Sequence, residues 1–105
     1  MTRNVELTTD AVEEVTHASQ WYDDRQDGLG LVFVAAVDRA INHLARWPHA
    51  GAPVDDVDPD LDVRTVRVER FPYSLAYVLH ESKAIVIAVI HDRRRPRYWI
   101  DRLDG

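Results

Sequence analysis

Apolar residues in the first half of the chain recur every three or four positions, which is the spacing of one face of an α-helix. Two such stretches predict two helices, one over residues 8–26 and one from Gly30 to about Trp47. The break DGLG separates them, and Pro48 stops the second helix. We therefore expect an antiparallel helical hairpin. Its two apolar stripes are Ala11, Val15, Ala18 and Tyr22, then Phe33, Val34, Val37, Ile41 and Leu44.

Strand patterns flank this hairpin. Residues 4–7 (NVEL) precede it as a short strand, and three further strands are predicted over residues 63–69, 74–80 and 84–92. The turns RFPY and HESK between these three are short enough only for antiparallel neighbours. The run KAIVIAVIHD is apolar on both faces, which marks a central strand. The order β-α-α-β-β-β predicts a single α+β domain over residues 1–105, with the hairpin packed on a mainly antiparallel sheet.

The segment over residues 48–62 is predicted to be a loop, because it contains three prolines, one glycine and five aspartates. The aspartates lack the glycine and terminal glutamate of a calcium-binding EF-hand loop, so we expect no metal site there. Four histidines share no spacing that would make a metal site, and we expect them at the surface. They are His17, His43, His49 and His80.

Composition is that of a folded cytoplasmic domain. The chain has 105 residues, of which 46% are hydrophobic and 30% charged, enough for one core. No apolar run approaches the roughly 20 residues that span a bilayer, and the N-terminus lacks the apolar core of a signal peptide. We therefore expect no membrane partner. The absence of cysteine excludes disulfides, thiolate zinc sites and thiol redox regulation, and nothing in the sequence calls for a cofactor.

The net charge of -5 hides an asymmetry between the two parts of the chain. Residues 1–63 hold four Lys and Arg against 13 Asp and Glu, whereas residues 64–105 hold nine against five. A basic region in an acidic chain can attract phosphate or a carboxylate-rich partner, because the local field depends on nearby charges. The alternative is that the two halves attract each other.

The basic region is concentrated in residues 91–99, HDRRRPRYW, which follow the last predicted strand. Arginine side chains just past a strand end can bind phosphate or carboxylate oxygens, and His91 can hold a proton near neutral pH. The alternative is that some arginines pair with the acidic hairpin and that His91 is only a strand-end residue. Trp99 is expected to pack the tail onto the sheet or hairpin, whereas Tyr98 can pack or contact a partner.

Four motifs in this order resemble the RelE/ParE superfamily of toxins from bacterial type II toxin-antitoxin modules, and more closely its ParE-like or plasmid-stabilisation branch. They are WYDDRQDGLGLVF at the hairpin, VR at Val63-Arg64, RFPYSLAY at residues 70–77 and AVIHDRRRPRYWIDR at residues 88–102. Each is weak alone, but together they cover nearly the whole chain. The resemblance implies a toxin that arrests growth unless a cognate antitoxin binds it.

The resemblance leaves two classes of target. A ParE-like toxin inhibits DNA gyrase by binding, without chemistry of its own. A RelE-like toxin is a ribosome-dependent endoribonuclease, in which the 2′-hydroxyl of the mRNA attacks the phosphate and no metal is needed. The net charge of -5 fits poorly with docking on ribosomal RNA, so we favour gyrase. A third possibility is a chain that keeps antitoxin binding but has lost toxicity.

The two targets assign different roles to the same part of the chain. Arg64 starts on the same strand face as Arg70 and matches the strand arginine of the family. As a nuclease, the chain would use His91, Arg64, Arg93 and Tyr98. As a binding protein, it would contact its target or an anion through Arg93, Arg94, Arg95, Arg97 and Arg70.

Overall fold

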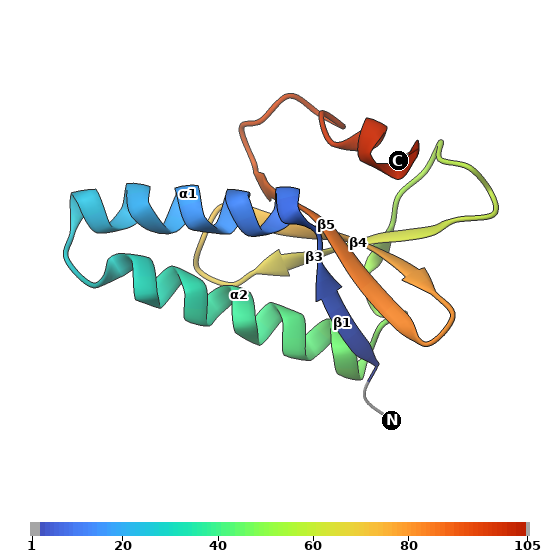
Figure 1. The fold of residues 1–105 in the computed structure, drawn as a ribbon, viewed down its shortest axis with the longest axis horizontal. Helices are drawn as coiled ribbons and strands as arrows, with labels where there is room; N and C mark the ends of the chain where they lie inside the picture. Colours follow the sequence, from blue (N-terminus) through green and yellow to red (C-terminus); the bar gives the residue numbers. More distant parts are fainter. Residues whose placement is uncertain (1–2, 105) are drawn as a thin grey trace.

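The computed structural model describes residues 3–104. Two helices, α1 (Thr9–Arg25) and α2 (Leu29–Arg46), form an antiparallel hairpin on one face of a sheet (Figure 1). The C-terminal segment, with the short 3-10 helix η1 (Ile100–Asp104), lies against the opposite face. The predicted α+β arrangement is confirmed. No helix among these residues is apolar over a length that could span a bilayer.

The sheet has five strands in the order β1-β5-β4-β3-β2. They are β1 (Asn4–Leu7), β2 (Ala52–Pro53), β3 (Asp62–Val68), β4 (Tyr73–His80) and β5 (Lys83–His91). β1 runs parallel to β5, and the other neighbours are antiparallel. The four strands expected from the sequence are confirmed to within one or two residues. The prediction of a loop over residues 48–62 is wrong at β2, where Pro53 is tolerated because the strand lies at the sheet edge.

The hairpin packs closely at Gly30, in the first turn of α2. A Cβ atom placed there would lie 2.5 Å from the Ser19 carbonyl oxygen and 2.8 Å from Asp23 Oδ1. The Gly30 N–H also donates a hydrogen bond to Asp23 Oδ1 at 2.7 Å. Only a residue without a side chain therefore fits between the two helices at this point.

Gly30→Ala is expected to lower the free energy of unfolding by roughly 1–3 kcal/mol, because the Ser19 backbone cannot move away without separating the helices. A urea titration measures the change. Ala35→Ser, a change at an exposed position of the same helix, is the control. A Gly30→Ala protein that unfolds like the wild type would show that the hairpin tolerates a wider separation.

The sheet carries a separate core on each face. All residues of the predicted helix stripes except Val34 contribute to the core between hairpin and sheet. The predicted packing of Trp99 against the sheet is confirmed by its exposure of only 4%. Buried residues on the hairpin side include Phe33, Leu44, Leu75, Tyr77 and Val86. Those on the side of the C-terminal segment are Val63, Ala76, Ile87, Ala88 and Trp99.

A β-bulge interrupts the pairing of β4 with β5. Ala76 pairs with Ala88, whereas the next residue, Tyr77, pairs with Val86, so Ile87 is left without a partner. The extra residue places Ile87 and Ala88 in the same core as Trp99. The bulge therefore lets two consecutive side chains of β5 cover the indole.

Candidate functional site

The cationic segment, residues 91–99, begins at the last residue of β5, beside the turn between β3 and β4. The Asp92 N–H donates to the Pro72 carbonyl at 2.9 Å. The Arg67 guanidinium donates two hydrogen bonds to the Asp92 carboxylate, at 2.6 and 3.2 Å. These hydrogen bonds lower the pKa of the Asp92 carboxyl below its ordinary value. Asp92, the second residue of this segment, is thus fixed to its neighbours.

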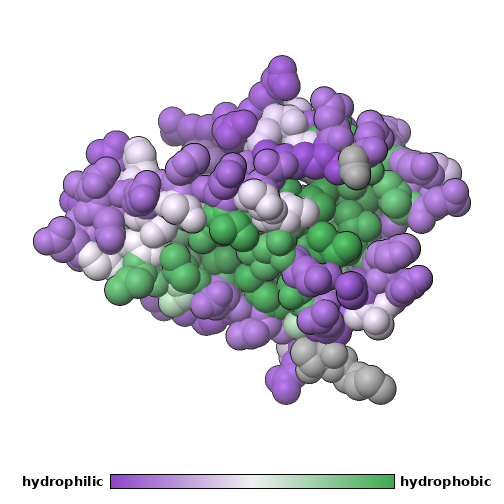
Figure 2. Space-filling view, viewed as in Figure 1, coloured by the Kyte–Doolittle hydropathy of each residue, from purple (hydrophilic) through white to green (hydrophobic). Residues whose placement is uncertain are grey.

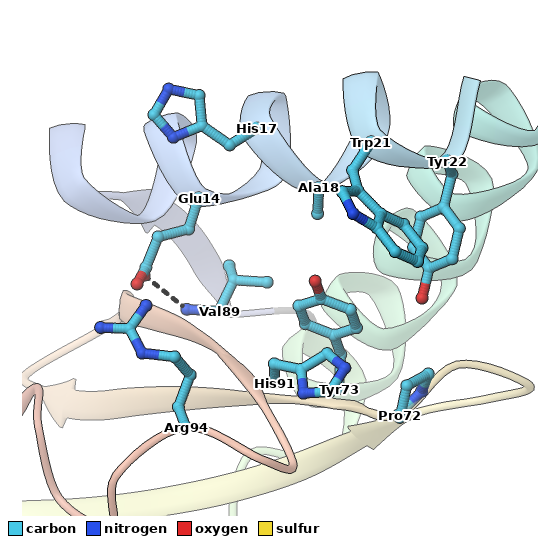
Figure 3. Close-up of a pocket in the computed structure, with 10 residues that line it drawn as sticks. All are labelled: Glu14, His17, Ala18, Trp21, Tyr22, Pro72, Tyr73, Val89, His91 and Arg94. Atoms are coloured by element: carbon cyan, nitrogen blue, oxygen red, sulfur yellow. Dashed lines mark hydrogen bonds between the residues drawn. The ribbon is translucent and has the colours of Figure 1, made fainter. Parts of the chain in front are cut away.

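A groove of about 550 Å³ opens between α1 and this end of the sheet (Figure 3). Trp21 on α1 and Tyr73 and His91 on the sheet line it, with the ring centres of Tyr73 and His91 5.0 Å apart. Arg94 extends from the loop after β5 and points toward Glu14 on α1 (Figure 3). The groove therefore combines aromatic surface with a cation, a combination that suits an anionic or aromatic group of a partner.

Glu14 joins α1 to the strand and the tail beside this groove. Its carboxylate accepts hydrogen bonds from the Val89 N–H at 3.0 Å, from Arg102 at 2.8 and 3.2 Å, and from the Tyr98 hydroxyl. Burial alone would raise the pKa of the Glu14 carboxyl, but these interactions outweigh it and the pKa is lowered from 4.5. The carboxylate is therefore ionised at neutral pH.

Acidification is expected to remove the stability that Glu14 contributes. The folded-state pKa of Glu14 lies below its ordinary value of 4.5, so the contribution is present above about pH 4.5 and is lost as the pH falls through the folded-state pKa. The melting temperature should fall more steeply with acidification for the wild type than for Glu14→Gln. Parallel curves for the two proteins would show that ionisation of this carboxyl is not linked to folding.

Four of the predicted binding arginines are exposed side chains at this end of the sheet. Within residues 3–104 none of them makes a salt bridge. The guanidinium carbon of Arg94 lies 3.8 Å from the centre of the Tyr98 ring, which holds it in a stacked position. The four are Arg70, Arg93, Arg94 and Arg95.

Arg97, the fifth predicted binding arginine, is engaged within the protein. Its guanidinium donates to the carbonyl oxygens of Asp55 and Asp56, each at 2.9 Å. This part of the basic segment therefore braces the aspartate-rich loop, through backbone oxygens rather than through carboxylates.

Arg64 lies away from the cationic end of the sheet. It pairs with Tyr77, which pairs with Val86, five residues before His91 on β5, a separation of roughly 16 Å along the strand. Its guanidinium donates to the Asp62 carboxylate at 2.9 Å and to the carbonyls of His49 and Gly51 at 2.6 and 3.1 Å. The structure therefore does not bring Arg64 together with the other three residues of the predicted nuclease set.

The two candidates for proton transfer, His91 and Tyr98, both form hydrogen bonds within the protein. The Nδ1 atom of His91 accepts a hydrogen bond from the Arg93 N–H at 3.0 Å, and the Tyr98 hydroxyl donates to Glu14. Burial, and then the hydrogen bond to Glu14, raise the pKa of the Tyr98 hydroxyl well above its ordinary value. Tyr98 is thus held protonated as a donor.

A comparison with protein families decides the family of this chain. The family model described as "ParE toxin of type II toxin-antitoxin system, parDE" matches residues 5–96. The chain belongs to this ParE toxin family. The match extends through both helices and all five strands as far as Pro96, so it includes most of the cationic segment. The family resemblance predicted from the sequence is confirmed.

The fold of this ParE-family chain is similar to that of a solved structure titled "Chromosomal ParDE TA system from P. aeruginosa". The TM-score is 0.71 at 18% sequence identity, and the match covers 86% of this chain and 96% of the other. At this identity the likeness establishes the fold alone. No match was found among curated proteins.

Sequence reasoning missed several residues that build the site of this ParE-family protein. Glu14 was one, although it stands in the apolar stripe between Ala11 and Ala18, where a carboxylate facing the core is a usable signal. Arg102 is the last residue of the motif at residues 88–102, but the sequence did not indicate its contact with Glu14. Tyr73, in the motif RFPYSLAY, is half-buried and lines the groove, a role that the sequence did not indicate.

Proposed function

We propose that this ParE-family protein arrests growth by binding DNA gyrase through the arginines at the end of its sheet, and that a cognate antitoxin neutralises it. The family match is the observation that carries the toxin assignment. Arg93 and Arg94 are exposed and make no salt bridge within residues 3–104, and Arg94 lines the aromatic groove, which supports a contact surface there. Arginine and aromatic side chains are the groups that most often carry the energy of a protein interface.

The arrangement of the side chains favours binding over RNA cleavage. A metal-independent nuclease needs arginines at the phosphate together with a group that takes or gives a proton. Here Arg64 is bound to a loop at the other end of the strand, and the Tyr98 hydroxyl is committed to Glu14. His91 and Arg93 remain adjacent, with the Arg93 backbone N–H donating to His91 Nδ1, so these two residues alone keep groups that a nuclease could use.

Two assays on the purified protein test the proposed target. We expect it to inhibit DNA supercoiling by purified gyrase at concentrations that leave in vitro translation and ribosome-bound mRNA intact. Cleavage of mRNA with normal supercoiling would replace gyrase with the ribosome as the target. An effect in neither assay, together with antitoxin binding, would identify a chain that has lost toxicity.

The antitoxin is proposed to cover the helical hairpin. Figure 2 shows apolar side chains gathered over the hairpin and the neighbouring part of the sheet. Val12 on α1 is 48% exposed, and Leu31 and Val32 on α2 are 75% and 49% exposed. An amphipathic segment can bury such side chains in the manner of a helix in a groove.

Co-purification tests this surface. The product of the reading frame adjacent to the gene should co-purify with the wild-type chain, and Leu31→Glu should weaken that association at least tenfold. Ser82→Glu, in the exposed turn between β4 and β5, adds the same charge elsewhere and should leave it unchanged. Equal binding by all three proteins would place the antitoxin on another face.

A further inference from the structure

The edge of β5 beyond β1 is closed by side chains. β1 ends at Leu7, opposite Val86, so within residues 3–104 no strand lies beside the following residues of β5 on the side away from β4. The Ile87 carbonyl instead accepts from Arg102 at 2.9 Å, and the Val89 N–H donates to Glu14 at 3.0 Å. Side chains from α1 and from the C-terminal segment thus take the place of a neighbouring strand.

Glu14 is the centre of this arrangement. Its Oε1 atom accepts from Val89 and Arg102, and its Oε2 atom accepts from Tyr98 and from the second Arg102 nitrogen. An ionised carboxylate has about four acceptor positions, and here each is occupied. The Glu14 side chain is 17% exposed and that of Arg102 is 24% exposed, so the ion pair is largely shielded from water.

The same arrangement reaches the arginines of the proposed target surface. Tyr98, held by Glu14, presents its ring to Arg94, whose guanidinium carbon lies 3.8 Å from the ring centre. We propose that Glu14 is a positioning residue, which fixes the C-terminal segment so that Tyr98 holds Arg94 at the groove under α1. The effect of Glu14 on inhibition of the target rests on the proposed function. The position of the C-terminal segment can be measured on the purified protein without a target.

No uncharged side chain can replace Glu14 in this role. Glutamine has the same shape, but its amide nitrogen cannot accept a hydrogen bond from Tyr98 or Arg102. Glu14→Gln therefore removes the ion pair with Arg102 and leaves two acceptor positions for four donors, while keeping the volume of the side chain. The neighbouring Glu13 is exposed and makes no hydrogen bond or salt bridge within residues 3–104, so Glu13→Gln is a matched control for the loss of one charge.

Hydrogen exchange measures the positioning directly. The N–H groups of Tyr98, Ile100 and Arg102 donate to carbonyls within the C-terminal segment at 3.0–3.2 Å. In Glu14→Gln their exchange should be at least tenfold faster, and this increase should be larger than that of the α2 amides, which report any general loss of stability. Glu13→Gln should match the wild type in both regions. Unchanged exchange in the C-terminal segment of Glu14→Gln would overturn the inference.

A double-mutant cycle tests whether Glu14 acts through Arg94. In the supercoiling assay, Glu14→Gln and Arg94→Ala should each weaken inhibition about tenfold, and the double variant should be no weaker than Arg94→Ala alone. If the losses of the two single variants add up in the double variant, Glu14 does not act through Arg94. The same follows if Arg94→Ala is defective and Glu14→Gln inhibits like the wild type. Neither result contradicts the proposed function. Wild-type inhibition by Arg94→Ala would instead overturn the proposed target surface.

Discussion

Trp99→Ala is expected to lower the free energy of unfolding by about 3 kcal/mol, because it removes a large aromatic side chain from a packed core. Trp99 is 4% exposed and lies with Ile87 and Ala88 on the sheet face opposite the helices. A change of this size should lower the melting temperature by roughly 15 °C in a domain of about this length. The specific activity of the folded fraction should stay close to that of the wild type.

The chain provides its own control for this substitution. Trp47, which follows α2, is 53% exposed against 4% for Trp99, so Trp47→Ala removes the same side chain from a position where it is far less buried. Its effect should stay within about 0.5 kcal/mol. A melting curve of Trp99→Ala that coincides with the wild type would show that the tail is not anchored by its tryptophan.

The second large effect concerns activity. Arg93→Ala/Arg94→Ala is expected to weaken gyrase inhibition at least tenfold, equivalent to about 1.4 kcal/mol, because a contact surface loses its main charges. His91→Ala should remain within a few-fold of the wild type, since a binding surface tolerates the loss of a weak donor. Supercoiling assays on purified variants, with melting curves in parallel, measure both. Growth on induction without antitoxin gives the same comparison in cells.

A pair of arginines elsewhere distinguishes a local effect from a loss of net charge. Arg39→Ala/Arg46→Ala removes two exposed arginines from α2 and should inhibit like the wild type. If the protein cleaves mRNA and His91→Ala lowers the cleavage rate by orders of magnitude, the protein is a nuclease, because His91 would then stabilise the transition state. Full activity of every folded variant would make residues 91–97 a structural segment.

Most of the fold could be predicted because its signals are local. Helix periodicity, the glycine break and short turns fix the order of the elements, and each depends on residues close in sequence. The strand at Ala52–Pro53 could not be predicted, because only its pairing with β3 distinguishes it from a loop. The bulge at Ile87 was hidden for a different reason, since a strand that is apolar on both faces shows no change of alternation.

The candidate site was harder to predict because its contacts are distant in sequence. The sequence identified the cationic segment, but not which arginines would be engaged. Arg64 and Arg97 bind backbone carbonyls of the loop over residues 48–62, and carbonyls leave no signature in the side-chain pattern. Glu14 and Tyr98 are 84 positions apart, so their contact follows only from the packing of α1 over the sheet.

The bulge also determines on which face of the sheet each later side chain of β5 lies. Side chains of a strand alternate between its faces, so one residue more or less reverses the face of each later position. With Ile87 as the extra residue, Val89 lies in the hairpin-side core and His91 lines the groove beside it. If the same residues paired regularly, with Ile87 opposite Ala76, His91 would turn toward the face that holds Trp99 and Ile90 would face the groove instead. Deletion of Ile87 would remove the bulge and leave His91 on the side of the groove. The bulge is therefore what allows β5 to cover Trp99 with two consecutive side chains and still present His91 to the groove at its end.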